Sequence, residues 1–199
     1  MEFLLEGLDE DKLTWTDKVD YDLYKSRKLY LNEVISPYTF NNIVPFIEHI
    51  NLLDDESGVK NRQPIELVIN SGGGSFHDGI SIITAIKRSK TPVHSLVYSY
   101  AFSMGLAIAQ ACDNRYMGKL ASLLFHEVMT EADGNGTQIK RTNDELDRIQ
   151  KIYDDLITGK SKVTQEMLDE QKGKVNDWVI DYEKATKLGL IEGAVEDLD

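Results

Sequence analysis

Residues 64–75 read PIELVINSGGGS, an apolar run rich in branched side chains that ends in three consecutive glycines. A run of branched apolar residues, interrupted here only by Glu66, favours a strand that is buried on both faces of a sheet. Glycine accepts backbone conformations that other residues avoid, so the glycines predict a sharp turn at the end of this strand. The segment therefore predicts a buried strand with an unusual turn at its carboxyl end.

A helix and a second strand are expected after this turn. Residues 79–90 place Ile83 and Ile86 on one helical face, and residues 92–98 return to strand character. A strand, a helix and a further strand in this order predict a right-handed βαβ unit.

The same alternation extends outward over the rest of the chain, and alternating strands and helices predict an α/β fold. We expect Gly159 to end the longest helix as a C′ glycine and Thr164 to cap the next helix. The expected strands are 28–31, 65–69, 92–98, a short one around Tyr116, 123–125 and one around 190–191; the expected helices are 38–53, 79–90, 106–111, 138–157, 165–171 and 182–188.

The length of the chain, 199 residues, suits one domain, which we place at residues 25–199. Residues 1–24 are acidic and weakly patterned, and we expect this N-terminal segment to be mobile.

Charge and cysteine content argue against several classes of function. The formal net charge of −12 and the lack of basic patches disfavour a nucleic-acid partner. The single cysteine, Cys112, predicts no intrachain disulfide, and its apolar neighbours predict core packing in a reducing cytoplasm. Acidic residues near the start and the lack of a long apolar run predict a cytosolic protein without a membrane partner. We expect no cofactor and no metal.

A candidate nucleophile lies in SYAFSMG, residues 99–105, where a strand is expected to turn into a helix. Ser103 would project its hydroxyl from a sharp bend, and the free N–H of Met104 at the helix start would point into the same space. Small neighbours at Ala101 and Gly105 would let a substrate carbonyl approach closely. On this segment alone, a serine that only caps the helix remains the stronger interpretation.

The glycines at 72–74 have more than one possible role. Their N–H groups can line a pocket that receives an anion. A phosphate loop is disfavoured because the Lys-Ser/Thr ending is missing, and so is the spacing of a dinucleotide fingerprint. A second oxyanion donor or a cradle for a substrate strand is the better functional interpretation, and a plain tight turn stays open.

A serine nucleophile needs a base, and the chain has four histidines. His49 lies in an early helix and His94 inside a strand, where structural roles are commoner. His77 near the glycine turn is the second choice. His126 directly follows an apolar strand, at the strand end where α/β folds place their sites, so it is the best candidate. A bystander role for it is equally well supported by this pattern alone.

The third member of a catalytic triad accepts the other imidazole N–H and fixes the tautomer. Asp177 precedes an apolar segment near the end of the chain. Because the chain has 34 acidic residues, composition alone does not select it.

Four motifs, taken in order, resemble the proteolytic subunit of the Clp protease. They are INSGGG at 69–74, YAFSMG at 100–105, LFH at 124–126 and the late Asp177, which is followed by Ala185 and GLI at 189–191. That family has Asn-Ser-Pro-Gly-Gly, Ala-Ala-Ser-Met-Gly, Met-Ile-His and Arg-Asp in the same order. The resemblance spans about residues 25–192.

The resemblance implies a serine endopeptidase with the crotonase-like ββα spiral of that family. By position, Ser103 corresponds to the nucleophile, His126 to the general base and Asp177 to the acid. Gly74 and Met104 correspond to the backbone donors of the oxyanion hole. The substrates would be polypeptides, cleaved through an acyl-enzyme without a cofactor.

The resemblance also implies an assembly. The long helix matches the family's protruding handle, at about residues 132–158, through which two seven-membered rings dock, and residues 134–136 match the strand-like lead into it. The chain would then be a homo-oligomer, a heptamer or tetradecamer, with residues 1–24 near the ring axis. No ATPase motif is present, so a separate AAA+ unfoldase would have to supply large substrates.

Four departures from the family pattern bear on these implications. Gly72 replaces a proline, Phe102 replaces an alanine, and Glu127 and Val128 replace a Gln-Pro pair. Asn176 stands where the family has an arginine used between rings. We expect Phe102 to narrow a pocket or alter packing, and Asn176 bears on whether a double ring forms. Such divergence is typical of a distant or phage-encoded member.

Three other functions compete with this one. A catalytically degenerate assembly protein, or one related to capsid processing, would keep the fold without the chemistry, and Phe102 and Asn176 favour it. An acyl-CoA enzyme on the crotonase fold would need no triad. A membrane signal-peptide peptidase of the Ser-Lys type would need a membrane segment. The three triad positions disfavour the last two.

Overall fold

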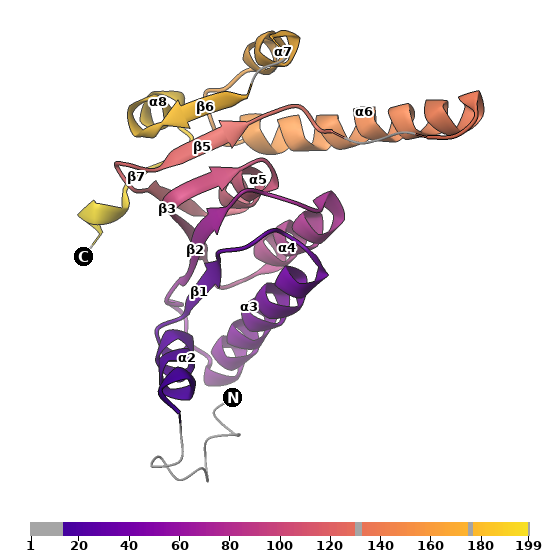
Figure 1. The fold of residues 1–199 in the computed structure, drawn as a ribbon. Coiled ribbons are helices and arrows are strands. Elements are labelled where there is room, and N and C mark those ends of the chain that lie inside the picture. The colour runs from indigo at the N-terminus through magenta and orange to yellow at the C-terminus, as the bar shows by residue number, and fades with distance from the viewer. Residues whose placement is uncertain (1–13, 130–132, 175–176, 199) are drawn as a thin grey trace.

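The computed structural model describes residues 14–129, 133–174 and 177–198. Figure 1 shows a twisted sheet with helices packed along it and one long helix that projects away from the rest. The predicted α/β fold is confirmed.

The sheet of the described residues has seven strands, five of which run in the order β1-β2-β3-β4-β7. Strand β5 pairs with β3, and β6 pairs with β5. The β5–β6 pair is antiparallel and the other pairs are parallel. The bounds are β1 (Lys28–Leu31), β2 (Ile65–Ser71), β3 (Val93–Phe102), β4 (Asn114–Met117), β5 (Ser122–Phe125), β6 (Trp178–Asp181) and β7 (Gly193–Ala194).

Strand β3 changes its neighbour halfway along its length. Its first half pairs with β4, from His94 opposite Asn114 to Val97 opposite Met117. Its last three residues pair with β5 instead, and Phe102 lies opposite Leu124. Because β3 and β5 run in the same direction, the residues that follow both strands emerge at the same edge of the sheet.

The helices of the described residues follow the predicted order, and the parallel strands of the predicted βαβ unit are present in β2, α4 and β3. The predictions for the helices near 38–53, 79–90, 106–111, 138–157, 165–171 and 182–188 are confirmed. The bounds are α2 (Trp15–Lys25), α3 (Pro37–Ser57), α4 (Phe76–Arg88), α5 (Met104–Ala111), α6 (Gly136–Thr158), α7 (Gln165–Gly173), α8 (Tyr182–Leu188) and the 3₁₀ turn η2 (Val195–Asp197).

Two local predictions are wrong. The last strand lies at Gly193–Ala194 rather than around 190–191. Leu190 and Ile191 are apolar because they pack into the core, and the carbonyl of Leu190 accepts from the Gln110 side chain at 2.9 Å. Gly159 does end α6, but its φ of −64° is right-handed, so it is not a C′ glycine.

Helix α2 was not predicted. It begins after Thr14, whose side chain accepts from Asp17 N–H while Asp17 reaches back to the Thr14 N–H. This reciprocal pair is a capping box, which fixes the start of the helix. The prediction of a mobile segment falls largely on residues 1–13, which lie outside the described residues.

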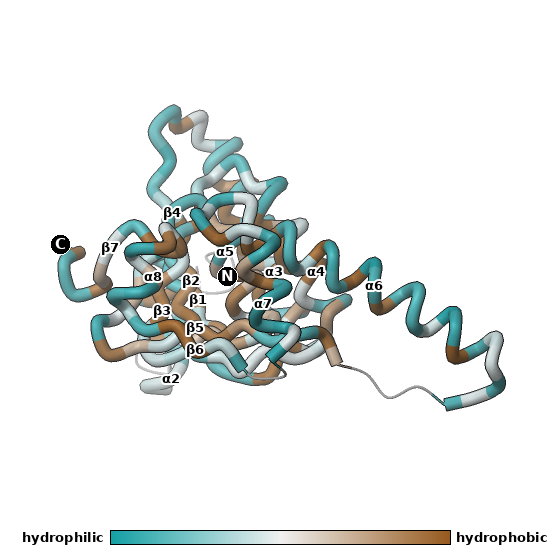
Figure 2. Tube along the Cα trace, turned by 90° about the horizontal axis from the view of Figure 1, so that it is seen from above, coloured by the Kyte–Doolittle hydropathy of each residue, from teal (hydrophilic) through white to brown (hydrophobic). Residues whose placement is uncertain are grey.

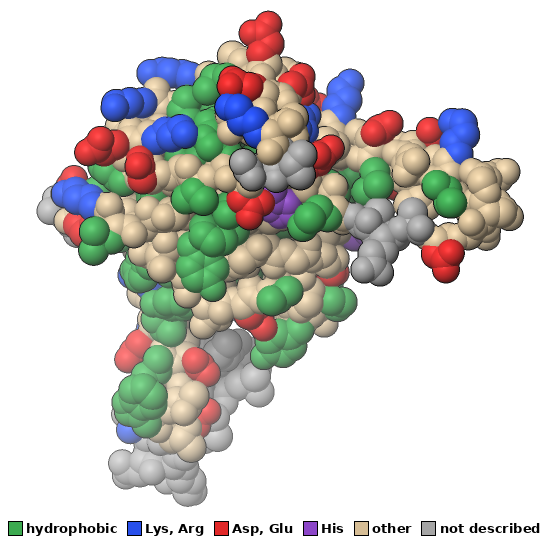
Figure 3. All heavy atoms as spheres, turned by 45° about the horizontal axis from the view of Figure 1, so that its top comes forward, with side chains coloured by type: hydrophobic (Ala, Val, Ile, Leu, Met, Phe, Trp, Pro, Cys, Tyr) green, Lys and Arg blue, Asp and Glu red, His purple; other side chains and the backbone are tan. Residues whose placement is uncertain are grey.

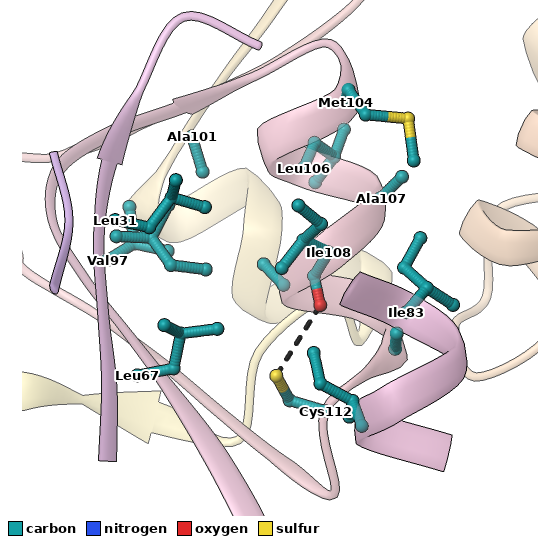
Figure 4. Packing of buried hydrophobic residues seen from close by; sticks show 14 of the residues in the cluster. Leu31, Leu67, Ile83, Val97, Ala101, Met104, Leu106, Ala107, Ile108 and Cys112 are labelled. Carbon is teal, nitrogen blue, oxygen red and sulfur yellow. Dashed lines mark hydrogen bonds between the residues drawn. The ribbon is translucent and has the colours of Figure 1, made fainter. Parts of the chain in front are cut away.

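The hydrophobic core lies between the sheet and helices α3, α4 and α5, as Figure 4 shows for Leu67, Val97 and Ile108. Helix α5 is buried along its whole length, which explains its small and apolar sequence. Cys112 follows it, has no exposed surface, and contacts the Ile108 carbonyl at 3.4 Å. Burial raises the pKa of this thiol to about 12, so the prediction of core packing is confirmed.

Helix α6 projects from the body of the molecule (Figures 1 and 2). Its buried residues, Ile149, Tyr153, Asp154 and Ile157, lie in its carboxyl half, while the outer half is largely hydrophilic. Asn135 caps its start, and within the described residues 133–135 no strand leads into it. The helix lies within the range of the predicted handle, about 132–158, and the handle's role in docking rings stays a prediction.

Candidate active site

Ser103 lies at the turn between β3 and α5 in a strained conformation, with φ 53° and ψ −125°. Such angles are costly for a side chain with a Cβ and persist only when surrounding contacts enforce them. The Ser103 N–H donates to the Leu124 carbonyl at 2.9 Å. Its own carbonyl accepts from Leu106 N–H at 2.9 Å and from the Tyr153 hydroxyl at 3.1 Å. Its side chain makes no capping hydrogen bond, so the interpretation of Ser103 as only a helix cap is not supported.

The glycine turn approaches Ser103 closely. A Cβ at Gly73 would lie 2.7 Å from the Ser103 Cβ and 2.9 Å from the Phe102 carbonyl oxygen, so a side chain does not fit there. Gly74, with φ 142°, packs against Ile35. The Ile35 N–H donates to the Gly73 carbonyl, and the Ile35 carbonyl accepts from the Ser75 N–H, both at 2.9 Å. The Gly74 N–H takes no part in these two hydrogen bonds.

A cavity of about 460 Å³, the Ser103 cavity, opens beside this turn. Gly74 and Met104 line it together with Ser103, and His126 contributes from the end of β5. The sequence-predicted oxyanion donors therefore border the same space as the nucleophile. Its other lining residues are Gly72, Ser75, Phe76, Val128, Met129 and Tyr153.

His126 follows β5 and Asp177 precedes β6, so the antiparallel ladder brings them together. Phe125 lies opposite Trp178 in this ladder, and His126 and Asp177 come one step further on. Both residues line a second cavity of about 160 Å³, the Asp177 cavity, which Lys172 also lines. His126 thus lines one cavity with Ser103 and another with Asp177.

His126 lines a cavity with each of the other two predicted triad residues, but within the described residues no hydrogen bond joins Ser103 to His126 or His126 to Asp177. The Nδ1 atom of His126 instead lies 2.6 Å from the Glu127 carbonyl oxygen. A carbonyl oxygen only accepts, so Nδ1 carries the proton and Nε2 is left as the basic nitrogen. This is the tautomer that a general base requires.

The other three histidines lie outside the Ser103 cavity. His49 stacks on Tyr24 with the ring centroids 5.7 Å apart. His94 lies 3.0 Å from the Asn114 side chain, and partial burial lowers the pKa of its imidazole. His77, the second choice, lies in the first turn of α4 and does not line the Ser103 cavity.

The structure places the departures from the family pattern, except Asn176, which lies outside the described residues. Phe102 packs against Tyr100 with ring centroids 5.0 Å apart and is not among the residues that line the Ser103 cavity, so the expected narrowing does not occur in that cavity. Gly72 borders the cavity, and Glu127 is exposed.

Two contributors were not predicted. Gly73 approaches the nucleophile more closely than Gly74, and only its place in the glycine run pointed to it. Tyr153 lies in the helix predicted at 138–157, and its hydroxyl donates to the Ser103 carbonyl. A buried tyrosine hydroxyl usually has a partner, but the sequence does not say which.

The described residues hold no group of three or more His, Cys, Asp or Glu side chains arranged to bind a metal ion. No helix among them is long and apolar enough to span a membrane. On the face shown in Figure 3, basic side chains are interspersed with acidic ones.

Comparisons with known proteins show which family the chain resembles. A family model described as Clp protease matches residues 10–197. The ATP-dependent Clp protease proteolytic subunit 1 of Prochlorococcus marinus is 27% identical over 179 residues, covering 86% of this chain and 87% of that protein. The ATP-dependent Clp protease proteolytic subunit of Streptococcus mutans is 28% identical over 185 residues, covering 88% and 90%. The chloroplastic subunit 3 of Arabidopsis thaliana is 27% identical over 181 residues, covering 88% and 55%.

Proposed function

The chain belongs to the Clp protease family of serine-type peptidases, and we propose that it cleaves peptide bonds with Ser103, His126 and Asp177 as its catalytic triad. The observation that carries this assignment is the position of His126, which lines both the Ser103 cavity and the Asp177 cavity. No other described histidine lines either of these two cavities.

In the proposed reaction, His126 Nε2 takes the hydroxyl proton as Ser103 Oγ attacks the carbonyl carbon of the scissile bond. The imidazolium then gives this proton to the leaving amine, and an acyl-enzyme ester remains on Ser103. Water, deprotonated by the same nitrogen, attacks the ester carbon, the bond between this carbon and Ser103 Oγ breaks, and the imidazolium returns the proton to Ser103 Oγ as the acyl product leaves as an acid. Asp177 stabilises the imidazolium and holds its orientation.

The oxyanion of each tetrahedral intermediate is assigned to the N–H groups of Gly74 and Met104. No carbonyl within the described residues accepts from either N–H, and both residues line the Ser103 cavity. Met104 begins α5, where the helix dipole also favours negative charge. Removing one donor of an oxyanion hole typically lowers kcat by about 100- to 1,000-fold.

Assembly and partners are proposed from the names of the relatives, which are ATP-dependent Clp protease subunits. We infer a homo-oligomeric ring, a heptamer or a pair of heptamers, in which the projecting α6 contacts a second copy. A separate AAA+ ATPase would unfold large substrates, whereas short peptides would enter alone. The site would then act inside a closed compartment.

The test is labelling of the full chain with a fluorophosphonate, read by intact mass. We expect one label per chain in the wild type and none in Ser103→Ala. The matched control is Ser99→Ala, which removes an exposed hydroxyl from the same strand and should label normally. Labelling that persists in Ser103→Ala would overturn the assignment of the nucleophile.

A catalytically degenerate ring subunit is the second candidate. It is favoured by one observation, the contact of His126 Nδ1 with the Glu127 carbonyl in place of Asp177. For this candidate we expect a ring-sized particle in which neither the wild type nor Ser103→Ala reacts with the fluorophosphonate. Labelling of the wild type alone would exclude it.

A further inference from the structure

Asp154 is a buried carboxylate that the proposed reaction does not use. Its side chain on α6 is 4% exposed. The Oδ1 atom accepts from Gln150 Nε2 at 2.7 Å, and Oδ2 accepts from Gln165 Nε2 at 2.7 Å and from Lys172 Nζ at 2.8 Å. A buried charge with three donors from two helices is costly to assemble, which calls for a reason beyond packing.

Two paths of contacts, which we call arms, start at Asp154. The first arm runs through Gln150 to the segment that carries His126. The Gln150 amide donates its NH₂ to Asp154, so its oxygen must face the other way. There it accepts the Val128 N–H at 2.7 Å. Val128 lies two residues after His126 and lines the Ser103 cavity. Asp154 therefore fixes the chain as it leaves β5, with Gln150 as the intermediary.

The second arm leads to the segment that carries Asp177. Lys172 lies in the last turn of α7, with a side chain only 16% exposed, and it also contacts Asp169 at 2.7 Å. It lines the Asp177 cavity with His126 and Asp177. Its ion pair with Asp154 holds the end of α7 against α6, just before the chain continues towards Asp177.

We propose that Asp154 is a positioning residue for the triad, acting through Gln150 on His126 and through Lys172 on Asp177. This inference rests on the proposed function. Without Asp154, the triad side chains would be displaced but still present. A displacement of about 1 Å lowers the rate of catalysis by about 100-fold. The effect should therefore fall on kcat, with little change in KM, because the two arms act on the triad segments rather than on the bound peptide.

The decisive variant is the double substitution Asp154→Leu with Lys172→Met, made in the full chain. Replacing a buried ion pair by apolar side chains of similar size is often neutral or stabilising, whereas removing one partner leaves an unpaired buried charge. Asp155→Asn is the matched control, since Asp155 is an exposed acid on the same helix.

The measurements are the urea midpoint, the oligomer size, and kcat and KM on a fluorogenic peptide. We expect the double variant to keep its midpoint, size and KM while kcat falls by about 10- to 100-fold. Asp155→Asn should match the wild type. Wild-type kcat in the folded double variant would overturn the inference and leave Asp154 with a structural role only.

Two further variants keep the result interpretable. If the double variant does not fold, Asp154→Asn, which keeps the shape but loses the charge, takes its place with the same expectation of a lower kcat at unchanged KM. Ser103→Ala tests the reaction itself. Peptidase activity that survives in Ser103→Ala contradicts the proposed function and this inference with it, whereas an inactive Ser103→Ala beside a fully active double variant contradicts only the role of Asp154.

Discussion

Gly73→Ala should destabilise the chain through the contact that shapes the nucleophile turn. Gly73 has φ 96°, a conformation that costs a residue with a side chain about 1–3 kcal/mol. The added methyl group would lie 2.7 Å from the Ser103 Cβ and 3.0 Å from the Met104 nitrogen. Forcing such contacts apart costs about a further 1–3 kcal/mol. The free energy of unfolding should therefore fall by about 2–6 kcal/mol.

The assay is urea unfolding of the Gly73→Ala variant beside Gly72→Ala. A methyl group added at Gly72 would have no other atom within 4 Å, and Gly72 has no positive φ, so its replacement should change stability by less than about 0.5 kcal/mol. With an m-value of about 2 kcal/mol per molar urea, a loss of about 4 kcal/mol lowers the Gly73→Ala midpoint by about 2 M.

Fluorophosphonate labelling of the same two variants reports on the nucleophile. We expect Gly73→Ala to label more slowly than Gly72→Ala, because its methyl group displaces the Ser103 turn. Equal midpoints and equal labelling rates for the two variants would refute the claim that close approach of Gly73 shapes this turn.

Three other substitutions or treatments test contacts at the Ser103 turn and elsewhere in the fold. Tyr153→Phe keeps the stack on Phe125 but loses the hydroxyl bond to Ser103, so urea unfolding should show a loss of about 1 kcal/mol, and no loss would contradict that bond. Iodoacetamide should not modify Cys112 in the native chain at a pH of about 8, because the thiol is buried with its pKa raised to about 12, and modification at the rate of the urea-unfolded chain would contradict this. A hydrogen-bonded ion pair with Arg27 lowers the pKa of the Asp54 carboxyl in the folded chain. The pair therefore stabilises the fold fully above the pKa of an unfolded aspartate, about 3.9, and this stabilisation is lost as the pH falls through the lower pKa of the folded state. In Asp54→Asn the free energy of unfolding should therefore fall less steeply as the pH is lowered. A slope equal to that of the wild type would contradict the role of the pair.

Periodicity and turn residues predicted most of the strands and helices, since elements such as α4 and α6 bury one face. The exceptions have local causes. Helix α2 buries only Tyr24, so it carries little periodic signal, and the pair Thr14 and Asp17 was the feature that would have revealed it. The last strand was misplaced because apolar residues at 190 and 191 mark burial as readily as they mark a strand.

The candidate site was predictable only as residue types in order. A serine between a strand and a helix, a histidine after a strand and a late aspartate were visible in the sequence. Their proximity depends on the change of neighbour along β3 and on the antiparallel return of β6, which are long-range pairings. The contacts of Tyr153 and Asp154 with the site depend on the packing of α6, which no local pattern encodes.

The contact between His126 and Glu127 gives the triad a second stable arrangement. A hydrogen bond from Nδ1 to a neutral carbonyl contributes about 0.5–1.5 kcal/mol, and one to a carboxylate about 1.5–3 kcal/mol. Turning from the Glu127 carbonyl to the Asp177 carboxylate would thus gain about 1 kcal/mol, before the cost of partly desolvating an exposed Asp177 is subtracted. Because the two arrangements are so close in free energy, the position of the segments that carry His126 and Asp177 decides which one forms. For this reason we expect the anchors Gln150 and Lys172, in the role proposed above, to affect the rate of peptide cleavage by fixing the positions of these segments.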